Sequence, residues 1–152
     1  MKCFRLYGFW LILMVLCSCD DTTYRSSVPA FPVRMELNIW AEYPHFVQSN
    51  TLQYLVFQKP RYEGVDYVGY AGLLVHIGMD GAYHAYDLAC PHCLSRDEVI
   101  EPDALFAVCP VCGEEYDLSY GLGVPVKGIS KEALRQYTTR FDPQKGKLYI
   151  TP

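Results

Sequence analysis

The chain lacks the long apolar segment that a membrane-spanning helix requires. Its apolar run near the start, from Leu6 to Leu16, is well short of the roughly 20 residues that cross a bilayer. The sequence also has no internal repeat, no low-complexity segment, no phosphate-binding glycine loop and no evident Ser-His-acid arrangement. We therefore predict no catalytic residue. A length of 152 residues leaves room for one ordinary domain.

The N-terminus has the order of a bacterial export signal. Lys2 and Arg5 precede the apolar run, and Leu16-Cys17-Ser18-Cys19 follows it. These last residues resemble the lipobox of bacterial lipoproteins, which predicts a signal peptide over residues 1–18 and lipidation of Cys19. Cys17 fits this pattern less well, because Leu16 would stand where a small residue is needed. The alternatives are an uncleaved anchor or an ordinary secretory signal, and each of them also places the domain outside the cytoplasm.

The export signal and the lipobox resemblance together predict a lipid-anchored protein of the cell envelope, facing the periplasm or the surface. Residues 19–32 are polar, include two prolines and predict a flexible tether, with the folded domain at 33–152. Removal of the signal takes Lys2 and Arg5, so that 13 basic side chains fall to 11 against 17 acidic ones and the formal charge becomes −6. This excess of acid argues against a nucleic-acid partner. The expected partners are the membrane and an unknown redox protein.

Cysteine spacing is the most informative feature of the chain. Of seven cysteines, Cys3 and Cys17 leave with the signal and Cys19 is used by the lipid. The remaining four form two C-x-x-C pairs, Cys90/Cys93 and Cys109/Cys112. Outside the cytoplasm four cysteines ordinarily form two disulfides, whereas paired C-x-x-C motifs with this separation are typical of a tetrathiolate metal site.

The pattern from Val33 onward predicts an all-β domain of short strands. Alternating or short apolar stretches predict strands at 33–39, 52–57, 72–77, 82–87, 105–108, 116–118, 135–141 and 147–150. Glycines at 78 and 81 predict a hairpin turn between the third and fourth of these. A helical turn is expected at 43–47 and a short helix at 131–134. Both cysteine pairs then fall in turns at strand ends, and metal-binding loops are expected at about 88–118.

The two cysteine turns have the composition of metal-binding knuckles. In Cys109-Pro110-Val111-Cys112-Gly113 the proline stiffens the turn and the glycine permits a left-handed backbone. Cys90-Pro91-His92-Cys93-Leu94 has the proline but not the glycine, and it adds an imidazole. The candidate metal ligands are therefore Cys90, His92, Cys93, Cys109 and Cys112.

From about Gly72 to Ile150 the chain resembles a Rieske-type iron–sulfur domain. The resemblance rests on Gly72–Val75, Asp80-Gly81, Ala85-Tyr86-Asp87, Cys90-Pro91-His92, Cys109–Asp117 and Val124-Pro125. It implies a Rieske-like antiparallel β-sandwich with a metal-binding subdomain formed by two loops. It also implies a two-iron two-sulfur cluster, with Cys90 and Cys109 on one iron and His92 on the other.

The chain departs from that family at the fourth ligand. The family has histidine where this chain has Cys112, and Glu114 replaces the usual serine. A thiolate in place of imidazole predicts a lower reduction potential. Cys93 also completes a four-thiolate set that binds zinc, or a single iron as in rubredoxin, which the knuckle Cys109–Gly113 equally resembles. Disulfides rank last among these alternatives.

We therefore expect an envelope one-electron carrier or redox sensor with a two-iron two-sulfur cluster, rather than a stand-alone enzyme. The alternative is a binding or assembly lipoprotein with a structural four-cysteine zinc site. His45, His76 and His84 receive no functional role. Asp87 and Asp117 are expected to make hydrogen bonds at strand ends.

Overall fold

The computed structural model describes residues 26–152. The predicted signal peptide, Cys19 and the first part of the expected tether lie outside the described residues. Within this described part of the chain, no helix combines the length and apolar character needed to cross a membrane. The domain is almost entirely β, and all of its strand pairs are antiparallel. The predicted fold class is confirmed.

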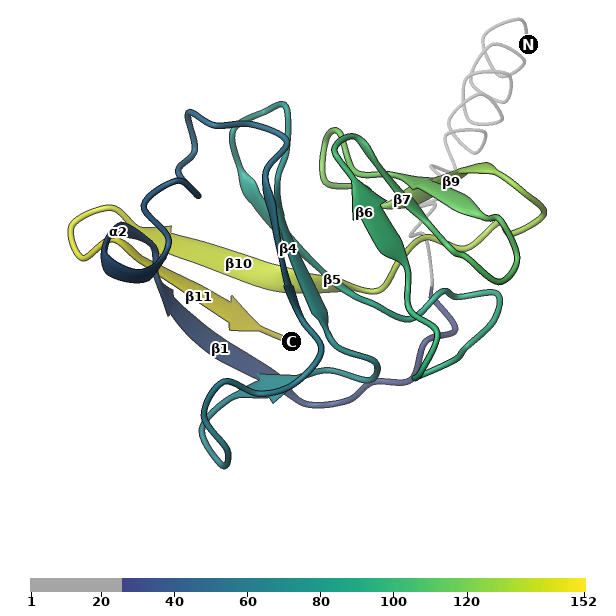
Figure 1. Cartoon of the computed structure of the whole chain (residues 1–152), viewed down its shortest axis with the longest axis horizontal. Coiled ribbons are helices and arrows are strands. Elements are labelled where there is room, and N and C mark those ends of the chain that lie inside the picture. Colours follow the sequence, from purple (N-terminus) through teal and green to yellow (C-terminus); the bar gives the residue numbers. More distant parts are fainter. Residues whose placement is uncertain (1–25) are drawn as a thin grey trace, which may run out of the picture.

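Seven strands form the larger sheet, in the order β2-β4-β5-β10-β11-β1-β3. It curls into a nearly closed barrel on one side of the molecule (Figure 1). A single helical turn, α2 (Ile39–Glu42), continues from β1. The strands of this sheet are β1 (Val33–Asn38), β2 (Tyr54–Phe57), β3 (Tyr67–Val68), β4 (Leu73–Ile77), β5 (Tyr83–Asp87), β10 (Gln136–Asp142) and β11 (Lys147–Thr151).

Four short strands form the smaller sheet beside it, in the order β6-β7-β8-β9 (Figure 1). They are β6 (Glu101–Asp103), β7 (Phe106–Val108), β8 (Glu115–Asp117) and β9 (Val124–Lys127). One cysteine pair precedes this sheet in the chain, and the other lies between β7 and β8. The smaller sheet thus adjoins both cysteine loops, in the region where the sequence predicts a metal-binding subdomain.

The hairpin of β4 and β5 separates two hydrophobic clusters. Leu73, Val75 and Ile77 face the interior of the larger sheet, whereas Leu74 and Tyr86 face the smaller sheet. All five residues of β4 are buried, because this strand has protein on both of its faces. The hairpin therefore provides the surface on which the cysteine loops are built.

His76 on β4 links the two sheets. Its side chain is fully buried, and its Nε2 lies 2.9 Å from the carbonyl oxygen of Ala104 in the turn between β6 and β7. Burial is the main reason that the pKa of His76 lies below its usual value. The neutral ring therefore joins the two sheets by a single hydrogen bond.

Two predicted hairpins, β4–β5 and β10–β11, are confirmed. Other local predictions differ from the structure. The helical turn expected at 43–47 lies earlier, at α2, where the Asn38 side chain accepts a hydrogen bond from the Ala41 amide. Residues 131–134 are irregular instead of helical. The sequence does not predict strand β9, which lies at the edge of the smaller sheet, where Pro125 is tolerated without a ladder donor.

The packed part of the chain begins before Val33. Val28, inside the range expected as tether, is only 2% exposed and belongs to the cluster under the smaller sheet. Its carbonyl accepts a hydrogen bond of 2.8 Å from Arg135 Nη1, and Ser27 Oγ donates to Glu132 at 2.8 Å. The polar composition of residues 26–32 predicts a tether, but Ser27 and Val28 pack against residues that follow them by about a hundred positions in the sequence.

Candidate metal centre

Asp87, the last residue of β5, positions the first cysteine loop. Its carboxylate is fully buried and accepts four hydrogen bonds: from the amides of Tyr70 at 2.6 Å, Ala71 at 3.1 Å and Ala89 at 2.9 Å, and from the Tyr137 hydroxyl at 2.7 Å. These bonds tie β5, β10 and the segment before β4 to the chain that enters Cys90. The predicted role of Asp87 in strand-end hydrogen bonding is confirmed, and Asp117 does the same for the Ser119 amide at 2.7 Å.

The two cysteine loops have the same backbone form. The Leu94 amide donates to the Cys90 carbonyl at 2.8 Å, and the Gly113 amide donates to the Cys109 carbonyl at 2.9 Å. Leu94 and Gly113 both have left-handed backbones, with φ of 53° and 72°. The first loop is therefore a complete knuckle although it lacks the glycine, and it accepts the backbone strain that a leucine carries there.

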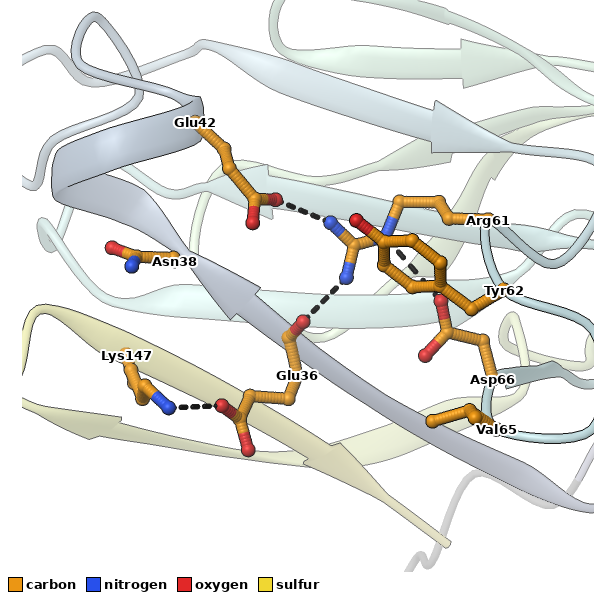
Figure 2. A pocket seen from close by; sticks show the side chains of 8 residues that line it. All are labelled: Glu36, Asn38, Glu42, Arg61, Tyr62, Val65, Asp66 and Lys147. Atoms are coloured by element: carbon orange, nitrogen blue, oxygen red, sulfur yellow. Dashed lines mark hydrogen bonds and ion pairs between the residues drawn. The ribbon is translucent and has the colours of Figure 1, made fainter.

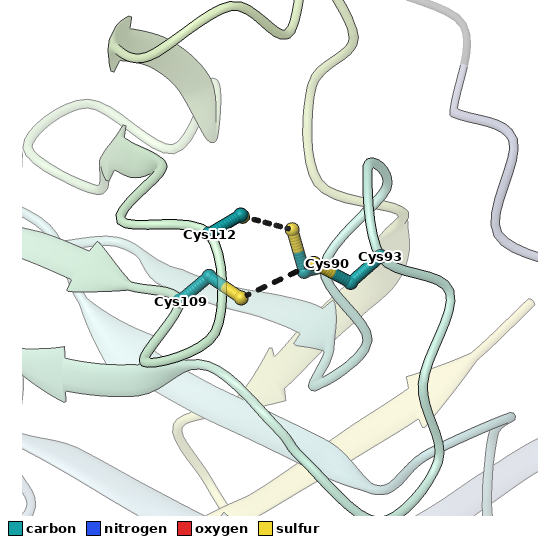
Figure 3. A group of neighbouring side chains, drawn as sticks. All are labelled: Cys90, Cys93, Cys109 and Cys112. Atoms are coloured by element: carbon teal, nitrogen blue, oxygen red, sulfur yellow. Dashed lines mark hydrogen bonds between the residues drawn. The ribbon is translucent and has the colours of Figure 1, made fainter.

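All four sulfurs meet between the two knuckles. Figure 3 shows the side chains of one knuckle pointing toward those of the other. The Sγ atoms of Cys90 and Cys112 lie 3.7 Å apart, and those of Cys93 and Cys109 lie 3.8 Å apart. All four sulfurs lie within 4.8 Å of one another. Cys90 and Cys109 are fully buried, whereas Cys93 and Cys112 are partly exposed.

The separations of 3.7 and 3.8 Å match edges of the ligand shell of one tetrahedral ion. Metal–sulfur bonds of about 2.3 Å require sulfur–sulfur edges of about 3.8 Å in a regular tetrahedron. A two-iron cluster inserts two irons and two sulfides between its ligand pairs, so that thiolates on different irons are held farther apart. The donor set and its spacing thus fit a single ion bound by four thiolates.

Burial and hydrogen bonds shift the pKa values of three of the four thiols, those of Cys93, Cys109 and Cys112. Burial is the largest cause that raises the pKa values of Cys93 and Cys112. Burial also opposes ionisation of Cys109, but backbone N–H groups of Cys112 and Val111 donate to its sulfur and lower its pKa overall. Four thiolates this close repel one another, and a bound cation offsets that repulsion.

Tyr116 on β8 is a site residue that the sequence did not reveal. Its buried hydroxyl lies 3.3 Å from Cys90 Sγ and donates to that sulfur when the cysteine is ionised. Burial, followed by this hydrogen bond, raises the pKa of Tyr116. The sequence predicts a strand at this position but no contact with a cysteine. The only sequence signal for the contact is the Tyr116-Asp117 pair that follows the second knuckle.

His92 lies at the edge of the site. The side chain is exposed, and its Nδ1 is 3.9 Å from Cys93 Sγ. Its ring nitrogens are not among the donor atoms that lie within 4.8 Å of one another. In this arrangement Cys93, and not His92, completes the set with the other three cysteines.

Glu114 is buried beside the second knuckle, where the resemblance would place a serine. It is 1% exposed, and its Oε1 accepts hydrogen bonds from the amides of Ile129 at 2.6 Å and Ser130 at 3.0 Å. The carboxylate therefore fastens the loop after β9 to the knuckle. A serine side chain is too short to reach the same two amides.

A separate cavity of about 330 Å³ lies on the larger sheet and has no cysteine in its wall. Arg61 occupies its centre, bonded to Glu42 at 2.5 Å and lying 3.4 Å from Asp66 (Figure 2). Lys147 pairs with Glu36 at its edge. Since these charged groups pair with one another, the cavity presents no evident reacting group.

No family model matches the chain, and no curated protein matches it. Among solved structures, the chain is similar to one from a complex of reduced oxygenase and oxidized ferredoxin in carbazole 1,9a-dioxygenase. The two are 13% identical, with a TM-score of 0.47, and the match covers 78% of this chain and 93% of the other. Fold and site together define an all-β protein in which four cysteines from two loops converge on one possible metal site.

Proposed function

We propose that the four cysteines bind one iron ion and that the protein is a one-electron carrier or redox sensor of the cell envelope. The observation that carries the proposal is the convergence of four sulfurs within 4.8 Å, with two pairs at 3.7 and 3.8 Å. Bound iron supplies a one-electron couple, and the thiolates of the two knuckles hold it.

Partial exposure of two ligands favours electron exchange over a purely structural role. Cys93 and Cys112 reach the surface, so that a partner can approach the metal closely, whereas Cys90 and Cys109 are sealed in the core. Hydrogen bonds to Cys109 and Cys90 stabilise negative charge on sulfur, which is one of the ways a protein sets the potential of such a site. The alternative with a structural zinc ion uses the same four ligands.

The two-iron two-sulfur cluster remains the alternative that the Rieske resemblance favours. It would use Cys90, His92, Cys109 and Cys112, and it would leave Cys93 free. That ligand set requires His92 to turn inward from its exposed position and the two knuckles to separate. The geometry of the four sulfurs therefore supports the single ion better.

Metal and acid-labile sulfide analysis of the protein, purified without oxygen, tests the proposal. One iron per chain without sulfide, and a visible absorption that bleaches with dithionite, would support it. One zinc per chain and no colour would overturn it in favour of the structural site. Iron with matching sulfide would establish the cluster instead.

We further propose that the protein reaches the membrane through lipid on Cys19. The support is the order of basic start, apolar run and lipobox-like residues in the sequence. Cell fractionation with metabolic fatty-acid labelling checks this. Label and membrane association that survive Cys19→Ala would contradict it, whereas Cys17→Ala is the matched control that should leave both unchanged.

A further inference from the structure

Three exposed apolar side chains lie on the two cysteine loops and on the loop that Glu114 fastens to the second of them. Leu94 and Val111 are 39% and 53% exposed and are chain neighbours of Cys93 and Cys112. Ile129 is 80% exposed, and Glu114, two residues after Cys112, binds its amide. These three side chains, here called the apolar collar, come from three separate loops. Apolar groups gathered around an exposed functional group are typical of an interaction surface.

Charge is distributed unevenly between the two parts of the domain. Residues 88–132, which hold the knuckles and the smaller sheet, carry eight acidic and three basic side chains, a formal charge of −5 with histidine neutral. Residues 26–87 and 133–152 carry seven of each and are neutral. The net charge of −5 on residues 26–152 therefore comes entirely from residues 88–132, the part that contains the four cysteines.

Part of this charge lies directly at the second knuckle. Glu101 on β6 and Glu115 on β8 are both paired with Val108, the residue before Cys109. Glu115 has Lys127 at 3.8 Å, whereas Glu101 is exposed and has no ion-pair partner among the described residues. Asp97 and Glu98, also exposed, lie in the loop between the first knuckle and β6. The collar thus belongs to the part of the domain that carries the excess of acidic side chains.

We propose that the apolar collar is the docking surface for a redox partner protein whose contact face is cationic. The inference rests on the proposed electron-transfer function and adds the chemistry of the partner. Complementary charge speeds association by steering, with effects of roughly 10- to 1000-fold that decrease as salt increases. The collar then excludes water where the exposed sulfurs meet the partner.

The test uses one probe in two charge states. Iron-loaded full-length protein, reduced with dithionite and freed of excess reductant, is mixed in a stopped-flow instrument with a lysine-rich c-type cytochrome or with the same cytochrome after succinylation of its lysines. We expect the cationic form to be reduced at least about tenfold faster at low salt. The gap should close near 1 M salt, where the screening length is about 3 Å. Equal rates at low salt would overturn the proposal.

Variants separate the surface from general effects of charge. Ile129→Ser removes one member of the collar, and Glu101→Gln removes one acidic charge from β6, opposite the residue that precedes Cys109. Both should slow reduction of the cationic cytochrome several-fold while the visible spectrum stays unchanged. Glu63→Gln, at an exposed acid on the neutral part, is the matched control and should have no effect. Equal slowing by Glu101→Gln and Glu63→Gln would contradict docking at the collar.

A binding titration distinguishes failure of the docking proposal from failure of the proposed function. Zinc-loaded protein is titrated with the same cationic cytochrome, and chemical-shift changes are followed. Salt-sensitive changes confined to the knuckles and the loop around Ile129 would support docking even if the native metal proved to be zinc. A protein with reducible iron that shows no such changes would retain its function and lose this docking surface.

Discussion

The larger and smaller sheets differ in what holds them together. The larger sheet has strands of up to seven residues and encloses a cluster of aliphatic and aromatic side chains that includes no cysteine. The smaller sheet has strands of three or four residues, and its cluster contains Cys90 and Cys109. Such short strands bury little apolar surface of their own. The comparison predicts that the larger sheet depends on its apolar core alone, whereas the smaller sheet depends on its site as well as on its core.

The largest effect should come from removing a metal ligand. Cys109→Ser replaces a buried thiolate with a hydroxyl, which is a poor metal ligand, so we expect the metal to be lost. The folded state then loses metal-binding free energy of roughly 10 kcal/mol or more. Hydrogen exchange should then lose protection over residues 88–127 but keep it in β1 and β11. Ala107→Ser adds a hydroxyl to the same cluster without touching a ligand and should retain the metal. Equal loss of protection in both sheets would show that the larger sheet depends on the metal as much as the smaller sheet does.

Asp87 joins the two parts, and its replacement should have the next largest effect. Asp87→Asn keeps the shape of the side chain but leaves some of its four donors without an acceptor. We expect a loss of roughly 2–4 kcal/mol in the free energy of unfolding, measured with urea. Tyr137→Phe removes only one of the four donors and should cost about 1 kcal/mol. A loss from Asp87→Asn no larger than that control would show that the carboxylate is not the junction.

Tyr116→Phe should leave both sheets folded and change the metal. Without the hydroxyl near Cys90 Sγ, the reduced and more negative form of the iron site is less stabilised. A hydrogen bond of about 1 kcal/mol corresponds to roughly 40 mV, so the reduction potential should fall by about that much. Protein-film voltammetry measures the change, and Tyr120→Phe, at a side chain that is 62% exposed, is the control. An unchanged potential would show that the hydroxyl does not act on the thiolate.

The smallest effect should follow from His92→Ala. Because the ring is exposed and stands outside the group of converging sulfurs, metal content and visible absorption should stay the same. Loss of the metal or a shifted spectrum would instead make His92 a ligand and favour the two-iron cluster. Lys131→Ala, at an exposed position on the loop after β9, provides a surface control.

Much of the larger sheet and the presence of a cysteine site were predictable from local patterns. Alternation of apolar residues located β1, and the glycines at 78 and 81 located the β4–β5 hairpin. The knuckle composition placed both cysteine pairs in turns. Strands β3 and β6 were missed, because two or three residues without clear alternation carry no periodic signal.

Sequence alone determined that four cysteines in two stiffened turns would share one region of an antiparallel β domain, because spacing and periodicity are local properties of the chain. Only the tertiary structure decided which side chains meet there. It turned His92 outward and Cys93 inward, placed the Tyr116 hydroxyl on Cys90, and used Glu114 to hold the loop after β9. These contacts join segments separated by 15 to 26 residues. They depend on how β5, β7 and β8 pack around the hairpin, which no single segment specifies.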